Sequence, residues 1–453
     1  MSSHLRLFLA GVLMILGGMA TAAEPLRVGV FHVDASPPIG SPLAYDPTKE
    51  VTLPLSVRGV VLLTEQRPIV LCAVDWIGIS NDAYHEFRRQ LAQAAETDPA
   101  RIAVHVLHQH DAPQADLSAA AMLAELGIVE QVYDVPFLKE VIQRTSKAVA
   151  QAVKDARPAT HLGLGEGIVE KVASNRRILG DDGKVKHVRF TATKDPVIRD
   201  APVGTIDPKL KLISFWNGED PIVAITYYAT HPQSYYRTGQ ANPDFPGMAR
   251  NDREAETKVP HVHFNGAGGN IGAGKWNDGS PENRPVLAAR VAAGMKAAWD
   301  STQRTPISAS DVAWKSIPVS LPLAPHLDAA NLKAILADKQ ATVGARAAAA
   351  SNLAWVNRCQ SGDTIDISCL RLGSARVLHL PGELFVEYQL AAQQLRPDLF
   401  VAMAAYGDDA PGYIGTEIAY SEGGYETSQP ASRVAPAVEG VLMDAIQKLL
   451  QDD

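Results

Sequence analysis

Cysteine is scarce in this sequence, and lysine and arginine form no long run. The 453 residues include three cysteines, and none has the paired spacing of a zinc finger, which excludes a cysteine-based structural metal site. The formal net charge is -8. Without a basic run to neutralise phosphates, we expect no nucleic-acid partner.

Long hydrophobic runs are absent beyond the N-terminus. There, His4 and Arg6 precede an apolar run over residues 7–16, and Ala20-Thr21-Ala22 follows. A charged start, a short apolar run and an A-x-A site are typical of a signal peptide, and the run is too short to span a membrane. We therefore expect residues 1–23 to be removed and the protein to be exported, to the periplasm or the medium. An uncleaved N-terminal anchor is the alternative.

Export would allow a disulfide. Cys359 and Cys369 flank the turn-like segment 360–363, and we expect them to pair. Cys72 lies within an apolar run at residues 68–74, which predicts a small core residue in a buried strand.

The remaining residues, 24–453, have the composition of a globular protein. Hydrophobic residues make up 46% and charged residues 20%, which is enough to form a core. Strands at residues 213–215 and 222–228 are expected to form a hairpin with Asn217-Gly218 in its turn. Along the chain, predicted strands and helices alternate irregularly. This indicates one large α/β domain with a mixed sheet, or sheets, and flanking helices. Residues 303–358 could form a helical insertion, in which Asp328 is expected to cap a long helix that runs through about Ala348.

The most informative stretch follows a predicted strand at residues 102–107. The strand runs into His108, His110 and Asp111, and Pro113 prevents it from continuing. Side chains alternate along a strand, so His108 and His110 are expected on one face. In α/β proteins, sites form at the carboxyl ends of strands. The alternative is a polar loop whose histidines bond the backbone.

Three further loops place reactive side chains at the ends of predicted elements. His231 follows a strand at 222–228, Glu383 follows Pro381-Gly382 where a strand leads into a predicted helix, and Tyr413 lies in the loop 411–417. Two neutral imidazoles and a carboxylate form the ligand set of a catalytic zinc with a position open to water, and such an ion activates that water. Taken singly, His231 is also consistent with a cap, Glu383 with a helix N-terminal acid, and Tyr413 with packing.

A glycine-rich segment at residues 266–274 has two interpretations. It is either a tight turn or a loop whose backbone N–H groups face an oxyanion or polar substrate; on the second view, Gly269, Asn270 and Gly272 bind substrate. It is not a P-loop, because Gly274-Lys275 is followed by Trp276 rather than Ser or Thr.

These loops, in this order, resemble the catalytic domain of the neutral (non-lysosomal) ceramidase family, from about residue 26 to the C-terminus. The matching segments are Val33-Asp34-Ala35-Ser36-Pro37-Pro38-Ile39-Gly40, His108-Gln109-His110-Asp111-Ala112-Pro113 (His-Thr-His-Ser-Gly-Pro in the family), Asn175-Arg176, Thr230-His231, Pro381-Gly382-Glu383, Tyr413-Ile414-Gly415-Thr416 and Tyr425-Glu426. The resemblance covers only the family's N-terminal catalytic domain, without its C-terminal immunoglobulin-like domain.

The resemblance implies that zinc is bound by four residues: His108, His231, Glu383 and Tyr413. It places three others around the scissile carbonyl: His110, Arg176 and Tyr425. The chemistry of these side chains agrees, since an imidazole can shuttle protons and a guanidinium or phenol can stabilise developing negative charge.

Two departures from the family affect the expected chemistry. Gly272 stands where ceramidases have the serine assigned to catalysis, so a serine-assisted route is impossible and metal-activated water remains. Asp111 replaces the family's serine, and its carboxylate could act as a base or orient His110. Both changes put the ceramide substrate in doubt more than the metal site.

The sequence therefore predicts an exported, zinc-dependent hydrolase that cleaves an amide (N-acyl, ceramide-like) bond, or less readily an ester. Its partner would be a small-molecule or lipid-like N-acyl substrate, with membrane contact only through that substrate. One alternative keeps the metal chemistry and acts on a sugar- or peptide-like compound, which polar residues such as Arg237 and Asp244 favour. The other is a binding protein that kept the scaffold and lost catalysis.

Overall fold

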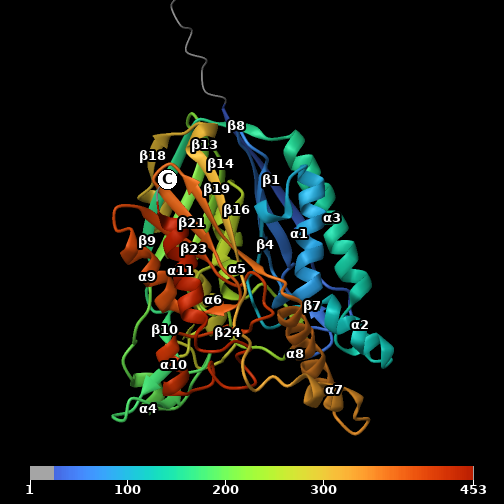
Figure 1. Ribbon diagram of the computed structural model, residues 1–453. Helices are drawn as coiled ribbons and strands as arrows, with labels where there is room; N and C mark the ends of the chain where they lie inside the picture. Colours follow the sequence, from blue (N-terminus) through green and yellow to red (C-terminus); the bar gives the residue numbers. More distant parts are fainter. Residues whose placement is uncertain (1–24, 452–453) are drawn as a thin grey trace, which may run out of the picture.

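The structure is a computed structural model that describes residues 25–451, so the predicted signal peptide lies outside the described residues. No helix within that range is long and apolar enough to cross a membrane. Three larger sheets with helices on their outer faces form the body of the molecule (Figure 1). The predicted mixed α/β fold is confirmed.

The first sheet has the strand order β6-β4-β3-β1-β8. Its strands are β1 (Leu26–Asp34), β3 (Ser56–Leu63), β4 (Ile69–Val74), β6 (Ile102–Val106) and β8 (Arg157–Ala159). Every residue of β4 and β6 is buried, because helices cover one face and a second sheet covers the other. The covering helices are α1 (Asn81–Ala95) and α3 (Val135–Lys154). Continuous apolar runs are what such doubly covered strands require.

The second sheet has the order β16-β14-β13-β9-β18. Its elements are β9 (His161–Ile168), β13 (Lys209–Asn217), β14 (Asp220–Tyr228), β16 (His261–Asn265) and β18 (Gln303–Pro306), covered by α5 (Asp244–Thr257) and α6 (Asn283–Asp300). The predicted hairpin is β13–β14, and its turn is Gly218-Glu219, one residue later than expected, since Asn217 pairs with Asp220.

The third sheet has the order β19-β20-β21-β23. Its elements are β19 (Val312–Val319), β20 (Ile365–Leu372), β21 (Ala375–His379) and β23 (Phe400–Ala404), with α9 (Val386–Leu395) and α11 (Val438–Leu450) against it. The segment 303–358 thus gives β18 and β19 to two sheets before α7 (Ala329–Ala337) and α8 (Val343–Ser361). Apolar residues of all three sheets meet in one interior cluster.

Shorter elements complete the chain. They are β2 (Glu50–Val51), β5 (Gly78–Ser80), β7 (Gln114–Asp116), α2 (Leu117–Glu125), β10 (Ser174–Asn175), β11 (Arg177–Leu179), β12 (Val185–Val188), α4 (Pro196–Asp200), β15 (Gln240–Ala241), β17 (Ile271–Gly272), β22 (Glu383–Leu384), β24 (Tyr413–Ile414) and α10 (Glu417–Glu422), with 3-10 turns at 99–101, 129–131 and 309–311.

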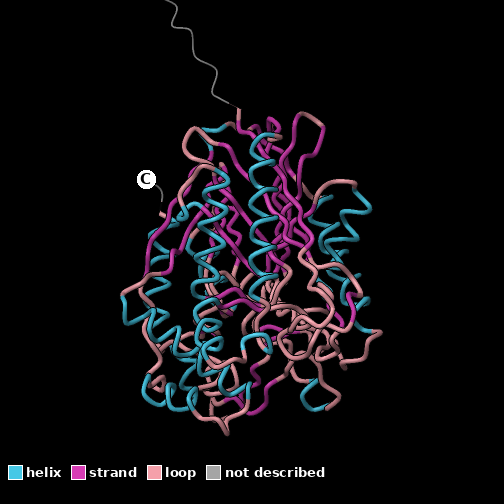
Figure 2. The backbone as a smooth tube through the Cα atoms, turned by 90° about the vertical axis from the view of Figure 1, so that its right-hand side faces the viewer, coloured by secondary structure: helices cyan, strands magenta, loops and turns pink. Residues whose placement is uncertain are grey.

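The strand directions decide where the candidate site lies. β4 with β6, β14 with β16, and β21 with β23 are parallel pairs, so within each pair the carboxyl ends meet at the same edge. The loops that follow gather in the lower half of the molecule, below the long strands (Figure 2). They carry the histidines, the glycine-rich segment and Glu383, as expected for an α/β fold.

Three local expectations were wrong. The helix expected from Asp328 through about Ala348 is two helices, because Asp338 is extended and Thr342 starts α8 by accepting a hydrogen bond from the Ala345 N–H. Glu383 begins the short strand β22 rather than a helix. All three cysteines, which lie within the described residues, are free: Cys359 lies on α8 and Cys369 lies in the middle of β20, so no turn brings them together.

Candidate metal centre

His108 is fixed by the backbone that follows β6. The strand ends at Val106, and His108 takes a left-handed conformation with φ +61, so it is not in the strand conformation expected from sequence. Its N–H donates to the Trp76 carbonyl (2.9 Å), and its Nδ1 lies 2.6 Å from the Ile77 carbonyl. Nδ1 must therefore donate, which leaves the lone pair on Nε2. A backbone carbonyl that orients the ring in this way is common for metal-ligating histidines.

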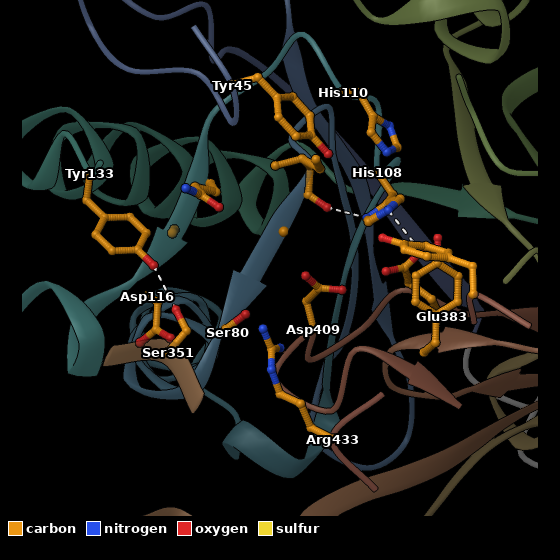
Figure 3. A pocket seen from close by; sticks show the side chains of 16 residues that line it. Tyr45, Ser80, His108, His110, Asp116, Tyr133, Ser351, Glu383, Asp409 and Arg433 are labelled. Carbon is orange, nitrogen blue, oxygen red and sulfur yellow. Dashed lines mark hydrogen bonds and ion pairs between the residues drawn. The ribbon is translucent and has the colours of Figure 1, made fainter. Parts of the chain in front are cut away.

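Glu383 approaches His108 from a different part of the chain. Its short strand β22 runs parallel to β24, with Glu383 opposite Tyr413, and its N–H donates to the Gly412 carbonyl at 2.9 Å. Glu383 Oε2 lies 3.2 Å from His108 Nε2 (Figure 3). This oxygen is buried and has no hydrogen-bond partner among the described residues, which is costly unless another group occupies the space.

His231 completes the approach from the loop after β14. Its N–H donates to the Ile271 carbonyl at 3.1 Å. Nδ1 lies 3.7 Å from Glu383 Oε2, and Nε2 lies 3.5 Å from His110 Nε2. The Tyr413 ring is parallel to the His231 ring, with centroids 6.2 Å apart. Four segments distant in sequence therefore converge, as the sequence predicted.

The donor atoms fit a zinc ion. Zn–N and Zn–O bonds of about 2.0–2.1 Å in a tetrahedral site put ligand atoms about 3.3–3.4 Å apart, close to the 3.2 and 3.7 Å measured from Glu383 Oε2. His108 belongs to two groups able to bind an ion, one with His110 and His231, the other with Glu383 and Asp409. An ion shared by these groups would satisfy the orphaned Glu383 oxygen.

Electrostatics also favour a cation here. Burial, followed by the charge of His108, lowers the pKa of His110 and of His231 well below the usual range, so both imidazoles are neutral and keep a lone pair. Burial also acts to lower the pKa of His108, but the Glu383 carboxylate outweighs it and the pKa is raised. The position between His108 and Glu383 therefore attracts positive charge, which a metal ion supplies as well as a proton does.

Arg176 lies beside this cluster and contacts Tyr413. It follows β10, and its backbone N–H donates to the Asn270 carbonyl at 2.8 Å. Its Nη1 donates to the Tyr413 hydroxyl at 3.0 Å, and its Nε lies 3.0 Å from the buried Glu426 carboxylate. Burial acts to lower its pKa, but Tyr413 and Glu426 leave the pKa raised. Arg176 is therefore a fixed cation within the site.

Tyr425 lies at the edge of the site. The residue is 41% exposed, and its ring packs edge-on against Tyr413, with centroids 5.7 Å apart. The Arg176 guanidinium lies over the Tyr425 ring, 5.7 Å from its centroid. The structure thus brings together seven of the predicted residues: His108, His110, Arg176, His231, Glu383, Tyr413 and Tyr425.

Asp111 has a different role from the one expected. Its carboxylate accepts hydrogen bonds from the N–H of Arg237 (3.0 Å), the N–H of Thr238 (3.2 Å) and the Thr238 hydroxyl (2.7 Å). Both oxygens are therefore engaged in fixing the 237–238 loop. A base or an orienting partner for His110 would need a free oxygen directed at that ring, and no such contact is present among the described residues.

The glycine-rich segment also supports the site rather than facing a ligand. The Gly269 N–H donates to the Leu384 carbonyl at 2.8 Å. The Asn270 amide donates to Glu387 (2.8 Å) and accepts from the Val386 N–H (2.9 Å). These contacts join the segment to the start of α9 and so position Glu383. The Gly269 N–H and the Asn270 side chain, which were expected to bind substrate, are thus engaged within the protein, and Gly272 packs beside the Arg176 stem.

Sequence reasoning missed a polar cavity next to the cluster. Its volume is about 190 Å³, and His108, His110 and Glu383 form one side (Figure 3). Asp409 and Arg433 extend into it. Burial raises the pKa of Asp409 to about 7, and the charge of His108 opposes this shift. The signal was present in Gly407-Asp408-Asp409-Ala410, immediately before the loop that carries Tyr413.

Comparison with known proteins places the fold but not the family. No family model matches the sequence, and no curated protein matches it. Two solved structures share the fold. One is a neutral ceramidase from Pseudomonas aeruginosa, with a TM-score of 0.68 and 14% identity over 94% of this chain and 74% of that chain. The other is a ceramidase complexed with C2, with a TM-score of 0.68 and 13% identity over 94% of this chain and 75% of that chain.

Proposed function

We propose that this chain is a zinc-dependent hydrolase that cleaves an amide bond in an N-acyl substrate. The observation that carries the proposal is the meeting of His108, His231 and Glu383 around one buried, unsatisfied carboxylate oxygen beside a cavity. The likeness to two ceramidase structures supports the same reaction class, because those proteins act on an N-acyl lipid. An ester is the less favoured substrate.

The ligand residues would be His108, His231 and Glu383, with Tyr413 next to them opposite Glu383. Bound there, zinc supplies a Lewis acid and lowers the pKa of a coordinated water toward ~7. The protein's own contribution is to fix the donors before the ion arrives. Ile77 orients His108, Ile271 anchors the His231 backbone, and Gly412 anchors that of Glu383.

His110 is the residue placed to move protons. It is buried and neutral, and its Nδ1 has no hydrogen-bond partner within the described part of the chain. Its Nε2 faces the cluster, 3.5 Å from His231 Nε2. An imidazole in this state accepts a proton from the attacking water and returns it to the leaving amine, which is the standard work of a general base and acid.

Arg176 is the residue placed to stabilise negative charge on the carbonyl oxygen. Glu426 and Tyr413 hold its guanidinium in place, and the Tyr425 ring, at the edge of the site, lies under that guanidinium. A cation that is already oriented before the reaction costs no reorganisation in the transition state. With Gly272 in place of a serine, no hydroxyl at that position takes part.

The test is hydrolysis of a panel of N-acyl compounds by the purified protein before and after metal removal. We expect at least one amide to be cleaved, loss of cleavage after dialysis against a chelator, and recovery with one equivalent of zinc but not with magnesium. Protein that contains stoichiometric zinc and cleaves no amide or ester in the panel would contradict the proposal and favour a binding role.

Export is part of the same proposal and has its own test. The charged start, the apolar run at 7–16 and the Ala20-Thr21-Ala22 site support it. N-terminal sequencing of the protein recovered from the periplasm or medium should begin at about residue 23 or 24. Recovery from the cytoplasm with an intact N-terminus would argue against export.

A second candidate keeps this chemistry and changes the substrate to a compact, non-lipid compound. The observation that favours it is the polar lining of the cavity beside the metal ligands, which includes Ser80, Gln114, Asp409 and Arg433.

A further inference from the structure

The cavity beside the metal ligands is too small for a long alkyl chain. Its volume is about 190 Å³, whereas a cavity of ~150 Å³ accommodates one benzene molecule. It therefore has room for about seven or eight non-hydrogen atoms, roughly half of a sixteen-carbon chain. We call it the inner cavity.

A second cavity of about 720 Å³ adjoins the inner one. The two share five lining residues: Tyr45, Gln114, Tyr133, Ser351 and Arg433. The outer cavity is also lined by apolar residues such as Leu43, Val132 and Val343. A substrate can thus place a small group inside and extend the rest of its length outward past Tyr45 and Tyr133.

The wall of the inner cavity offers hydrogen bonds and charge. Asp409 lies between the metal ligands and Arg433 (Figure 3), and its Oδ1 is buried without a hydrogen-bond partner in the described chain. Arg433 is the single arginine, and no lysine is present, among the described residues that line this cavity. Its Nε donates to Asn352 (2.6 Å) and its Nη1 to the Ala410 carbonyl (2.9 Å), so these two bonds hold the guanidinium at the cavity wall and leave its Nη2 outside them.

Farther from the metal ligands, the wall remains polar. The Tyr133 hydroxyl lies 3.1 Å from the Ser351 hydroxyl, and Asp116 accepts from Asn81 at 2.8 Å. An alkyl group placed here would leave the Asp409 Oδ1 without a partner and offer no further acceptor to the Arg433 guanidinium, which is strongly unfavourable. A polar group would satisfy both.

Resting on the proposed hydrolase function, we propose that the substrate places a compact polar group in the inner cavity, of the size of a small amino acid. This group carries a hydroxyl or ammonium donor for Asp409 and an acceptor oxygen for Arg433. Asp409 and Arg433 are the residues that set this specificity. The other side of the scissile bond leaves through the outer cavity, so compounds with long alkyl chains on both sides are poor substrates.

The substrate test is a matched panel that varies both sides of the amide. The amine side is serine, glucosamine or a sphingoid base, and the acyl side is acetyl or palmitoyl. We expect kcat/KM for the best serine or glucosamine compound to exceed that for palmitoyl sphingoid base by at least about tenfold. The serine and glucosamine arms show which polar group fits better. Equal or faster cleavage of the compound with two long chains would overturn this inference and leave the proposed function intact.

The residue test uses Asp409→Asn and Arg433→Lys with the zinc-loaded protein. Each should lower kcat/KM for the preferred polar substrate by about tenfold or more and lower that for the alkyl compound by less, so that the preference shrinks. Calorimetry with the free polar product should show the same loss of affinity. Asp98→Asn and Arg67→Lys, an exposed pair elsewhere, serve as controls and should change neither value.

Zinc content separates this specificity role from metal binding. Asp409 is close enough to His108 and Glu383 to share an ion with them, so the Asp409→Asn variant is assayed for zinc. Retained zinc with a reduced preference supports the inference. Loss of zinc, or an equal loss of activity on every substrate, overturns it. A wild-type protein that binds no zinc and cleaves nothing refutes the proposed function itself.

Discussion

The Glu383 carboxylate lies 3.2 Å from His108 Nε2, although His108 follows a strand of the first sheet, and Glu383 begins β22 in the opposite half of the chain. Two backbone features create this contact. His108 turns into the left-handed region with φ +61 directly after β6, and β22 pairs with β24 so that Glu383 enters next to Tyr413. A non-glycine residue in that region is strained, and residues held in such conformations cluster at functional sites.

Replacing Glu383 by Gln should weaken zinc binding by more than about 100-fold, since changes even to the partners of metal ligands cost 10–100-fold. The variant preserves the shape of the side chain and removes its charge, so the fold should be retained. Competition with a chromogenic chelator measures the dissociation constant. Glu417→Gln, at an exposed position, is the control and should bind zinc as the wild type does. Unchanged affinity in Glu383→Gln would exclude this carboxylate as a ligand.

Replacing Arg176 by Lys should lower kcat by about 100-fold with little change in zinc content. Lysine keeps the positive charge that the buried Glu426 carboxylate requires, but its ammonium cannot reach Tyr413 and Glu426 together. Removing one oriented donor to developing negative charge lowers kcat by about 10²–10³. Steady-state kinetics separate kcat from KM. Arg177→Lys, which changes the neighbouring cation of the same Glu426, is the matched control. A rise in KM alone would assign Arg176 to substrate binding instead.

Two glycines of the same segment should respond differently to alanine. At Gly272 an added Cβ would meet the Arg176 stem at 3.5 Å, an ordinary contact, so the melting temperature of Gly272→Ala should stay within a few degrees of the wild type. At Gly269 the added Cβ would collide with the Glu383 carbonyl. Gly269→Ala should therefore unfold at lower temperature and also lose zinc. Thermal melts with parallel metal analysis test both, and equal behaviour would contradict the packing described.

Buried histidines should make stability fall with acid. Burial lowers the pKa of His105 from 6.5 to about 4, so between these values the unfolded chain binds a proton that the folded chain does not. Stability is then complete above about pH 6.5 and is lost as the pH falls toward 4. At about 1.4 kcal/mol per pKa unit, this change amounts to about 3 kcal/mol.

Urea unfolding at a series of pH values measures this dependence. His105→Gln should flatten the dependence between pH 6.5 and 4 without abolishing it, because burial also lowers the pKa of His379 and of His263. His85→Gln, at a half-exposed position, is the control and should leave the slope unchanged. A His105 variant with the wild-type slope would show that this residue is not buried in its neutral form.

The sequence predicted the strands and the convergence of His108, His231 and Glu383, for a physical reason. Apolar runs such as residues 69–74 and 102–106 are unambiguous when both faces of a sheet are covered, and the loops after them carry few residue types able to bind zinc. The site lies where such strands end, so His108, His231 and Glu383 could be found from order and type alone.

What the sequence could not predict depends on long-range hydrogen bonds. Asp111 looked like a catalytic carboxylate, but its oxygens accept from residues 237 and 238, a contact with no local signal. Asn270 and Gly269 looked free to bind a ligand, and they instead join the start of α9. The inner cavity is formed by segments far apart in the chain, so the acidic pair Asp408-Asp409 did not reveal which groups Asp409 would face, and Arg433 had no pattern that marked it.

The most direct test of the account is the zinc content of the purified protein and of three variants. Elemental analysis should find about one zinc per chain in the wild type and in His85→Ala, and almost none in His108→Ala or His231→Ala. The two variants without zinc should also lose amide hydrolysis. Retention of a full equivalent of zinc by either of the last two variants, or hydrolysis by a zinc-free form, would contradict a shared metal at the centre of this site.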